Sequence, residues 1–157
     1  IGDSMPHNKT MVTKLLTFSL SLAFLFSFSG FVYSEEPEVR RGYWDNGKLK
    51  SEVSFKNGKL EGKATAWYEN GKKRNETHFK NGEVDGLLID WYPSGKKWME
   101  LYHKNGVLDG ASTVWYKSGA KKSEERYKDG KEHGMVTEWD EDGKITFQGT
   151  FKDGNEE

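Results

Sequence analysis

The sequence predicts an all-β fold, an elongated antiparallel meander of about ten short strands built from five 24-residue β-hairpin repeats. The first observation is a ladder of x-Gly dipeptides whose spacing alternates strictly between 11 and 13 residues. The second is that the seven or eight residues between turns suit strands and are too short for stable helices. The third is that Asn-Gly and Asp-Gly supply the positive φ angles that tight hairpin turns need. The ladder consists of Asn46-Gly47, Asn57-Gly58, Asn70-Gly71, Asn81-Gly82, Ser94-Gly95, Asn105-Gly106, Ser118-Gly119, Asp129-Gly130, Asp142-Gly143 and Asp153-Gly154.

The residues before the ladder have the composition of a targeting segment. After Met11 comes Lys14, and an apolar run then extends from Leu15 to Val32. A basic, an apolar and a small-residue region in this order are typical of a secretory signal peptide. We therefore expect a signal-peptide helix, cleavage near Ser34, and a secreted or periplasmic protein of the cell envelope. The alternative is a membrane anchor formed by residues 15–33, because the run is about long enough to cross a bilayer.

Three segments follow from this organisation: a leader over residues 1–34, a short linker over residues 35–42, and the repeat array over residues 43–157. The whole chain carries 24 Lys and Arg against 25 Asp and Glu, a net charge of −1. No basic excess is available to neutralise phosphates, so we expect no nucleic acid as a partner. The chain has no cysteine, so the array must be stabilised by burial and backbone pairing rather than by disulfides.

The length of the turns decides which face each aromatic residue occupies. We expect a two-residue turn at Asn70-Gly71, which pairs Tyr68 with Lys73 and places Trp67 opposite Arg74. We expect a four-residue loop from Gly82 to Asp85 between units. Both lengths are even, and an odd length would reverse the faces. The predicted core face carries Trp44, Tyr68, Tyr92 and Tyr116 with Leu49, Val53, Phe55, Thr77, Phe79, Met99, Leu101, Ile145, Phe147 and Phe151. The predicted charged face carries Trp67, Trp91, Trp115 and Trp139.

The tryptophan column is the candidate binding surface. Its members recur about 10 Å apart, once every two strands. We expect cation–π pairs between Trp67 and Arg74 and between Trp115 and Lys122, and a contact between Trp91 and Trp98. Such rows bind proteins, glycans or membrane interfaces, whereas the alternative is that they stabilise the array by cross-strand packing. The candidate surface comprises Trp67, Trp91, Trp98, Trp115, Trp139, Arg74, Lys122, Glu76 and Glu100.

We predict no catalytic, cofactor-binding or metal-binding residue. The glutamate column is Glu52, Glu76, Glu100 and Glu124, and its spacing overlaps the separation of glycosidase carboxylates. Its recurrence in every unit beside Lys and Arg favours structural ion pairing. His78 and His103 are expected on opposite faces, and no metal-ligand spacing is present.

The repeats resemble MORN repeats, specifically the bacterial MORN-variant repeat. Phe147-Gln148-Gly149-Thr150-Phe151-Lys152-Asp153-Gly154 is similar to the MORN pattern of aromatic-x-Gly-x-aromatic-x-x-Gly. Elsewhere the match is to the variant form, as in Trp67-Tyr68-Glu69-Asn70-Gly71 followed by Phe79-Lys80-Asn81-Gly82. The middle glycine is replaced by Val53, Thr77, Leu101 and Glu125. The resemblance extends over about 110 residues, from Tyr43 to Gly154.

The resemblance implies an elongated β-hairpin array used for protein interaction and scaffolding, with contact to phospholipids disputed. Many bacterial variant-repeat proteins carry a YwqK-like antitoxin label, a role that a signal peptide makes less compatible with action inside the cell. We therefore expect an exported, non-enzymatic module whose partner is another protein. The alternatives are a cell-wall glycan or lipid surface bound by the tryptophan row, and an antitoxin or immunity-type protein that binds a toxin.

Overall fold

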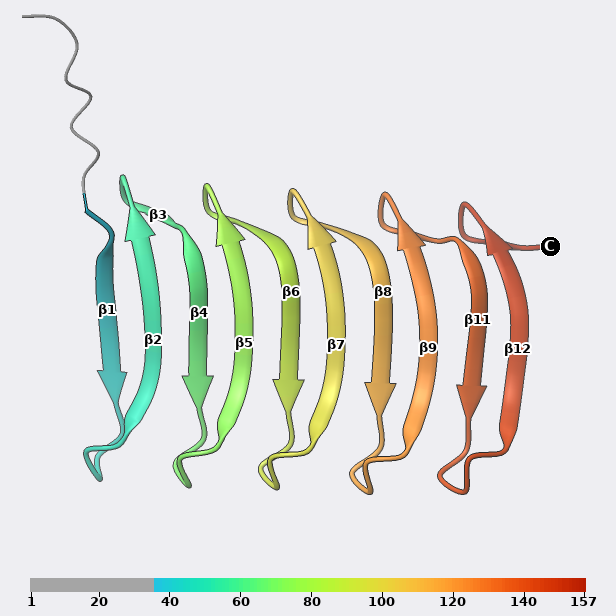
Figure 1. Cartoon of the computed structure of the whole chain (residues 1–157), viewed down its shortest axis with the longest axis horizontal. Coiled ribbons are helices and arrows are strands. Elements are labelled where there is room, and N and C mark those ends of the chain that lie inside the picture. Colours follow the sequence, from blue (N-terminus) through green and yellow to red (C-terminus); the bar gives the residue numbers. More distant parts are fainter. Residues whose placement is uncertain (1–35) are drawn as a thin grey trace, which may run out of the picture. The chain divides into compact units, whose positions relative to one another are not determined.

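The described residues fold into a single antiparallel sheet. The computed structural model describes residues 36–157, so the predicted signal peptide and membrane anchor lie outside the described residues. Figure 1 shows the long strands side by side in chain order, each antiparallel to its neighbours. The strands are β1 (Glu38–Tyr43), β2 (Leu49–Lys56), β3 (Lys59–Leu60), β4 (Gly62–Trp67), β5 (Lys73–Lys80), β6 (Glu83–Trp91), β7 (Lys97–Lys104), β8 (Val107–Trp115), β9 (Lys121–Lys128), β10 (Lys131–Glu132), β11 (Gly134–Trp139), β12 (Ile145–Lys152) and β13 (Asn155–Glu156).

The all-β meander predicted from the ladder is confirmed, and the thirteen strands contain the expected ten. β3 and β4 occupy the same repeat position as the continuous strand β6, and β10 and β11 are interrupted in the same way. β13 is a two-residue strand that pairs with the end of β12. One strand lies where a linker was expected, because β1 occupies most of residues 35–42 and pairs with β2 along its whole length.

The two kinds of turn are the reverse of those predicted. The tight two-residue turns are Asn57-Gly58 and its equivalents, in which both residues have positive φ, 51° and 73° at this turn. Such a pair defines the type I′ turn, whose twist matches that of a hairpin. The turn after Tyr68 is instead a three-residue loop, because the Tyr68 amide donates to the Lys72 carbonyl and the Gly71 amide donates to the Tyr68 carbonyl, both at 2.8 Å.

A bulge restores the predicted faces despite the odd loop. Trp67 pairs with Lys73 while Ala66 pairs with Asn75, so Arg74 is an extra residue in β5. The odd loop and the extra residue each exchange the two faces once, so together they leave the assignment of side chains to faces unchanged. Tyr68 therefore shares the face of Phe79, as expected. We call this surface the tyrosine face and the opposite one the tryptophan face. The same register shift recurs at Tyr43, Trp91, Trp115 and Trp139.

Residues beside the bulge are the exceptions to the predicted faces. Leu49 and Ile145 were expected on the face of the tyrosines. They pair instead with Tyr43 and Trp139, on the tryptophan face. The reason is that both precede the extra residue, so strict alternation counted from the middle of the strand fails there.

The predicted core face is not covered by a second layer in the described part of the chain. Val136 is the one buried hydrophobic residue within residues 36–157, at 4% exposure. The other buried residues there are hydroxyl-bearing, namely Thr65, Thr77, Ser112, Ser123 and Thr137. Small β-branched and hydroxyl side chains in the middle of the strands fit a pleated surface between larger neighbours. Within residues 36–157, no other element therefore covers either face of the sheet.

Candidate binding surface

A ladder of hydroxyl groups on the tyrosine face ties each repeat to the next. Tyr68 donates a hydrogen bond to the main-chain carbonyl of Trp91 at 2.6 Å. Tyr92 donates to the Trp115 carbonyl and Tyr116 to the Trp139 carbonyl, both at 2.9 Å. The aromatic pair therefore has a structural role that the sequence pattern did not reveal. The second residue of each pair, such as Tyr68, donates a hydrogen bond through its hydroxyl. The main-chain carbonyl of the first residue of the next pair, such as Trp91, accepts it. Trp44 makes the equivalent bond through its indole N–H, at 3.3 Å to the Trp67 carbonyl.

A repeated cluster of lysine, glutamate and tryptophan occupies the tryptophan face. In the first copy the Lys73 ammonium lies 2.6 Å from Glu76 Oε2 and 5.5 Å from the centre of the Trp91 ring. In the next copy Lys97 pairs with Glu100 and lies 5.5 Å from the Trp115 ring. We call these clusters the Lys–Glu–Trp row. The third copy is Lys121, 2.8 Å from Glu124 and 5.6 Å from the Trp139 ring.

The predicted aromatic contacts were therefore wrong in their partners. Lysines that precede the bulge cover the tryptophans of the following unit, in place of the expected pairs Trp67–Arg74 and Trp115–Lys122. Lys122 instead lies 5.8 Å from the Tyr116 ring. Trp98 contacts Tyr92 rather than Trp91, with ring centres 6.1 Å apart.

The bulge moves three predicted surface residues to the opposite side of the sheet. Arg74, Trp98 and Lys122 were assigned to the charged face, and all three lie with the tyrosines. The lysines that take their place were missed because strict alternation put them on the core face. Their signal was present in the sequence as Lys-x-x-Glu recurring every 24 residues at Lys73, Lys97 and Lys121.

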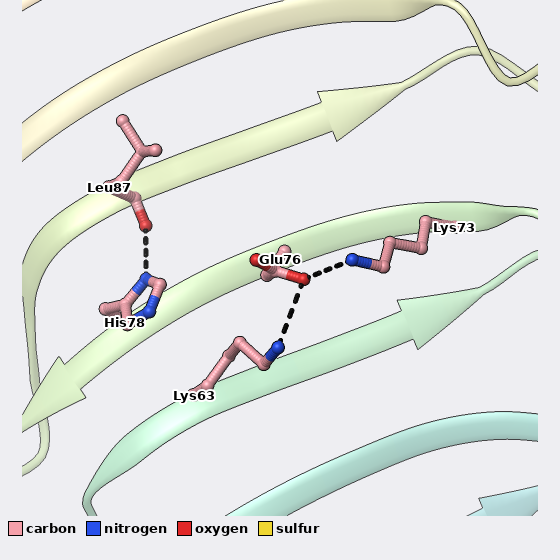
Figure 2. Close-up of polar contacts among 5 residues, drawn as sticks. All are labelled: Lys63, Lys73, Glu76, His78 and Leu87. Carbon is pink, nitrogen blue, oxygen red and sulfur yellow. Dashed lines mark hydrogen bonds and ion pairs between the residues drawn. The ribbon is translucent and has the colours of Figure 1, made fainter.

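Glu76 is the most enclosed carboxylate of the row. Its side chain is 15% exposed, and Lys63 approaches it from β4 at 3.5 Å in addition to Lys73. Figure 2 shows both lysines converging on this carboxylate, with His78 bonded to the Leu87 carbonyl nearby. The hydrogen bond from Lys73 lowers the pKa of Glu76, and the charges of both lysines act in the same direction. A carboxylate held ionised between two ammonium groups serves as a fixed negative charge.

The arrangement favours recognition over acid–base chemistry. Glu76, Glu100 and Glu124 each have a lysine partner. The pKa of Glu76 is lowered, whereas a general acid needs a raised pKa. His78 and His103 lie on opposite faces, as expected from their register. Burial lowers the pKa of His103. Within residues 36–157, no three His, Cys, Asp or Glu side chains are grouped to hold a metal ion.

Shallow hollows lie on both faces of the described sheet. One hollow of about 270 Å³ lies on the tryptophan face and is lined by Thr113, Glu124, Arg126, Met135 and Thr137 among others. Met135 is 59% exposed there. Another hollow, of about 450 Å³, lies beside Arg74 and Trp98. The part of the chain that the structure describes includes no helix long and apolar enough to cross a membrane.

Comparison with protein families agrees with the repeat geometry. The MORN repeat variant family matches residues 39–57, 60–81, 84–106 and 132–153. The intervening unit, around β8 and β9, has the same strand pairing, bulge and tyrosine bond as its neighbours. No curated protein matches the chain. The four matched segments follow the strand repeats and together cover more than half of the sequence, and the chain therefore belongs to the MORN repeat variant family.

Proposed function

We propose that this protein is an exported, non-enzymatic module that binds another protein through the Lys–Glu–Trp row. The observation that carries the proposal is the regular recurrence of charge and aromatic surface on an uncovered sheet face. Copies of the cluster are about 10 Å apart, because two strand spacings separate them. A partner lying across the strands would meet the same cluster several times.

The chemistry of the row suits a protein surface. The rings of Trp91, Trp115 and Trp139 are half-buried, and a lysine side chain lies against each of them. Protein interfaces combine aromatic anchors with a polar rim that fixes orientation. Repeat families such as this one are typically non-catalytic binding modules, and the ion-paired glutamates fit that role.

A cell-wall glycan or lipid surface is the competing ligand for the row. A sugar ring or a lipid headgroup needs an open indole face, and displacing the lysine from its ring and its glutamate has a cost. We therefore expect residues 35–157 to remain in the supernatant when they are sedimented with peptidoglycan or liposomes. Sedimentation with either that is lost in the double variant Trp91→Ala with Trp115→Ala would contradict a protein partner for the row and support the competing ligand.

Capture from cell-envelope extract tests the protein partner. Immobilised residues 35–157 should retain a stoichiometric partner, and the double variant Trp91→Ala with Trp115→Ala should lose it. Trp98→Ala is the matched control, because it removes an indole from the opposite face. Recovery of no partner, or equal recovery by the double variant, would refute binding through the row. A toxin as the captured protein would support the antitoxin-type role that the family resemblance implies.

Export is tested separately. The proposal rests on the apolar run from Leu15 to Val32 and on the small residue Ser34 before the expected cleavage site. Mass spectrometry of the protein isolated from the cell envelope should give an N-terminus at or near Glu35. An intact leader would favour the membrane anchor over residues 15–33, and recovery from the cytoplasm alone would contradict export.

A further inference from the structure

One place in the array departs from the repeat at several positions together. The bulge position carries Trp98 in the third unit, whereas the other units have Lys50, Arg74, Lys122 and Thr146. Asn75 stands where the other units have Ser51, Met99, Ser123 and Phe147, and Asp90 stands where they have Gly42, Ala66, Val114 and Glu138. The combination of a guanidinium, an amide, a carboxylate and an indole at these neighbouring positions occurs once in the array, which points to a local role rather than a structural one.

These departures line one hollow on the tyrosine face. The hollow has a volume of about 450 Å³, and its lining includes Tyr68, Arg74, Asn75, Asp90 and Trp98. Arg74 is on β5 and Trp98 is on β7, so they face each other across β6 at a separation of about 10 Å. A guanidinium thus bounds one side of the hollow and an indole the other, with amide and carboxylate groups between them.

The floor of the hollow is a fixed polar network. Thr77 donates its hydroxyl to Asn75 Oδ1 at 2.8 Å, and Asn75 Nδ2 donates to Asp90 Oδ1 at 2.6 Å. Both bonds are partly buried, so they hold the side chains in one orientation. Among residues 36–157 no hydrogen bond is made to Asp90 Oδ2, which leaves this oxygen to accept a bond from a ligand.

The walls are equally well placed for a ligand. Trp98 is 44% exposed and rests against Tyr92 with a tilt of 38° between the rings. Tyr92 is itself fixed by its bond to the Trp115 carbonyl. Within the described residues Arg74 takes part in none of the ion pairs. A free guanidinium binds a carboxylate through two parallel hydrogen bonds.

We propose that this hollow binds a carboxylated pyranose, such as a uronic acid residue of an acidic glycan. The C–H face of the ring would lie on the Trp98 indole, a ring hydroxyl would donate to Asp90, and the carboxylate would pair with Arg74. A neutral sugar would leave the guanidinium without a partner. An acidic peptide would satisfy Arg74 but bring no hydroxyl donor to the Asp90 carboxylate, so the sugar fits the whole set of groups better.

Titration of the full chain with trigalacturonate, followed by calorimetry, tests the proposal. We expect saturable binding that is weakened about tenfold or more by Trp98→Ala and by Arg74→Gln, a loss of about 1.4 kcal/mol for each tenfold step. Maltotriose, which has no carboxylate, should bind about tenfold more weakly than trigalacturonate, and Arg74→Gln should abolish that difference. Tyr43→Ala is the matched control, because it removes an exposed aromatic ring from the other face, outside the Lys–Glu–Trp row, and should leave the affinity within about twofold.

Several outcomes would overturn the assignment. Absence of saturation by trigalacturonate up to about 10 mM would do so, because an affinity weaker than that is not specific recognition. Equal affinity for maltotriose would remove the role of Arg74. Binding of triglutamate with the same sensitivity to Trp98→Ala and Arg74→Gln would assign the hollow to a peptide. Circular dichroism of each variant distinguishes lost binding from lost folding, and Arg74→Gln changes an exposed residue that the sheet does not need.

Discussion

Removal of the Tyr92 hydroxyl should weaken the array without changing its shape. Tyr92→Phe deletes one hydrogen bond, 2.9 Å long and partly buried, between adjacent repeats. A neutral bond of this kind contributes about 0.5–1.5 kcal/mol to the free energy of unfolding. The equivalent bonds of Tyr68 and Tyr116 are about 10 Å away along the sheet, so their losses should add. The triple phenylalanine variant should therefore lose about 1.5–4.5 kcal/mol, a large share of the stability of a typical domain.

Urea denaturation followed by far-UV circular dichroism measures these losses. Tyr102→Phe is the matched control, because Tyr102 is 47% exposed and its hydroxyl has no hydrogen bond within residues 36–157. We expect the control to stay within about 0.5 kcal/mol of the parent. If Tyr92→Phe and Tyr102→Phe were equally stable, the tyrosine hydroxyl bonds between repeats would not contribute to the stability of the array, and their structural role would be refuted.

Three further predictions concern the turns, the row and the period. Gly95→Val and Gly143→Val should each lower the free energy of unfolding by about 1–2 kcal/mol, because these glycines have positive φ angles of 88° and 85°. An unchanged melting temperature in either variant would contradict the loop geometry. Glu76 has a lowered pKa, so its stabilisation is present above the ordinary value of 4.5 and is lost as pH falls below it. Glu76→Gln should thus destabilise the protein at pH 7 and differ less from the parent at pH 3, with Glu124→Gln, whose side chain is 50% exposed, as the milder comparison. Deletion of residues 92–115 removes one whole unit and joins Trp91 to Tyr116, so this variant should form a shorter, cooperatively folded array. Deletion of residues 92–103 removes half a unit, and this variant should not fold. Equal behaviour of the two variants in denaturation would refute the 24-residue period as the folding unit.

Strand positions and faces could be predicted from the sequence, but the connections could not. Asn-Gly and Asp-Gly mark turns wherever they occur, and the 24-residue period fixes their alternation. The dipeptide alone does not separate a type I′ turn, with positive φ at Asn57, from a three-residue loop in which only Gly71 has positive φ. Away from the bulge the predicted faces were still right, because the extra residue at Arg74 offsets the odd loop.

The candidate surface was predicted in part for the same reason. The tryptophan column depends only on the parity of the strand centres, and the structure places it as expected. Contacts beside the bulge depend on local geometry, which alternation does not describe. This is why Lys73 rather than Arg74 pairs with Trp67, and why Trp98 lies beside Tyr92.

Equivalent positions in the five repeats can be compared to separate the residues that the fold requires from those that it does not. The bulge position tolerates Lys50 and Lys122, which lie against Trp44 and Tyr116 at 4.6 and 5.8 Å, so a cation on an aromatic ring satisfies the fold there. Trp98 is therefore not required for the sheet, and the residue is 44% exposed to solvent. The same reasoning applies to Asp90, whose equivalents are Gly42, Ala66, Val114 and Glu138, so the fold accepts side chains of different size and charge there. The fold does not need these side chains, and they lie together in one hollow. Changes at such positions can alter binding specificity from one unit to another without altering the array.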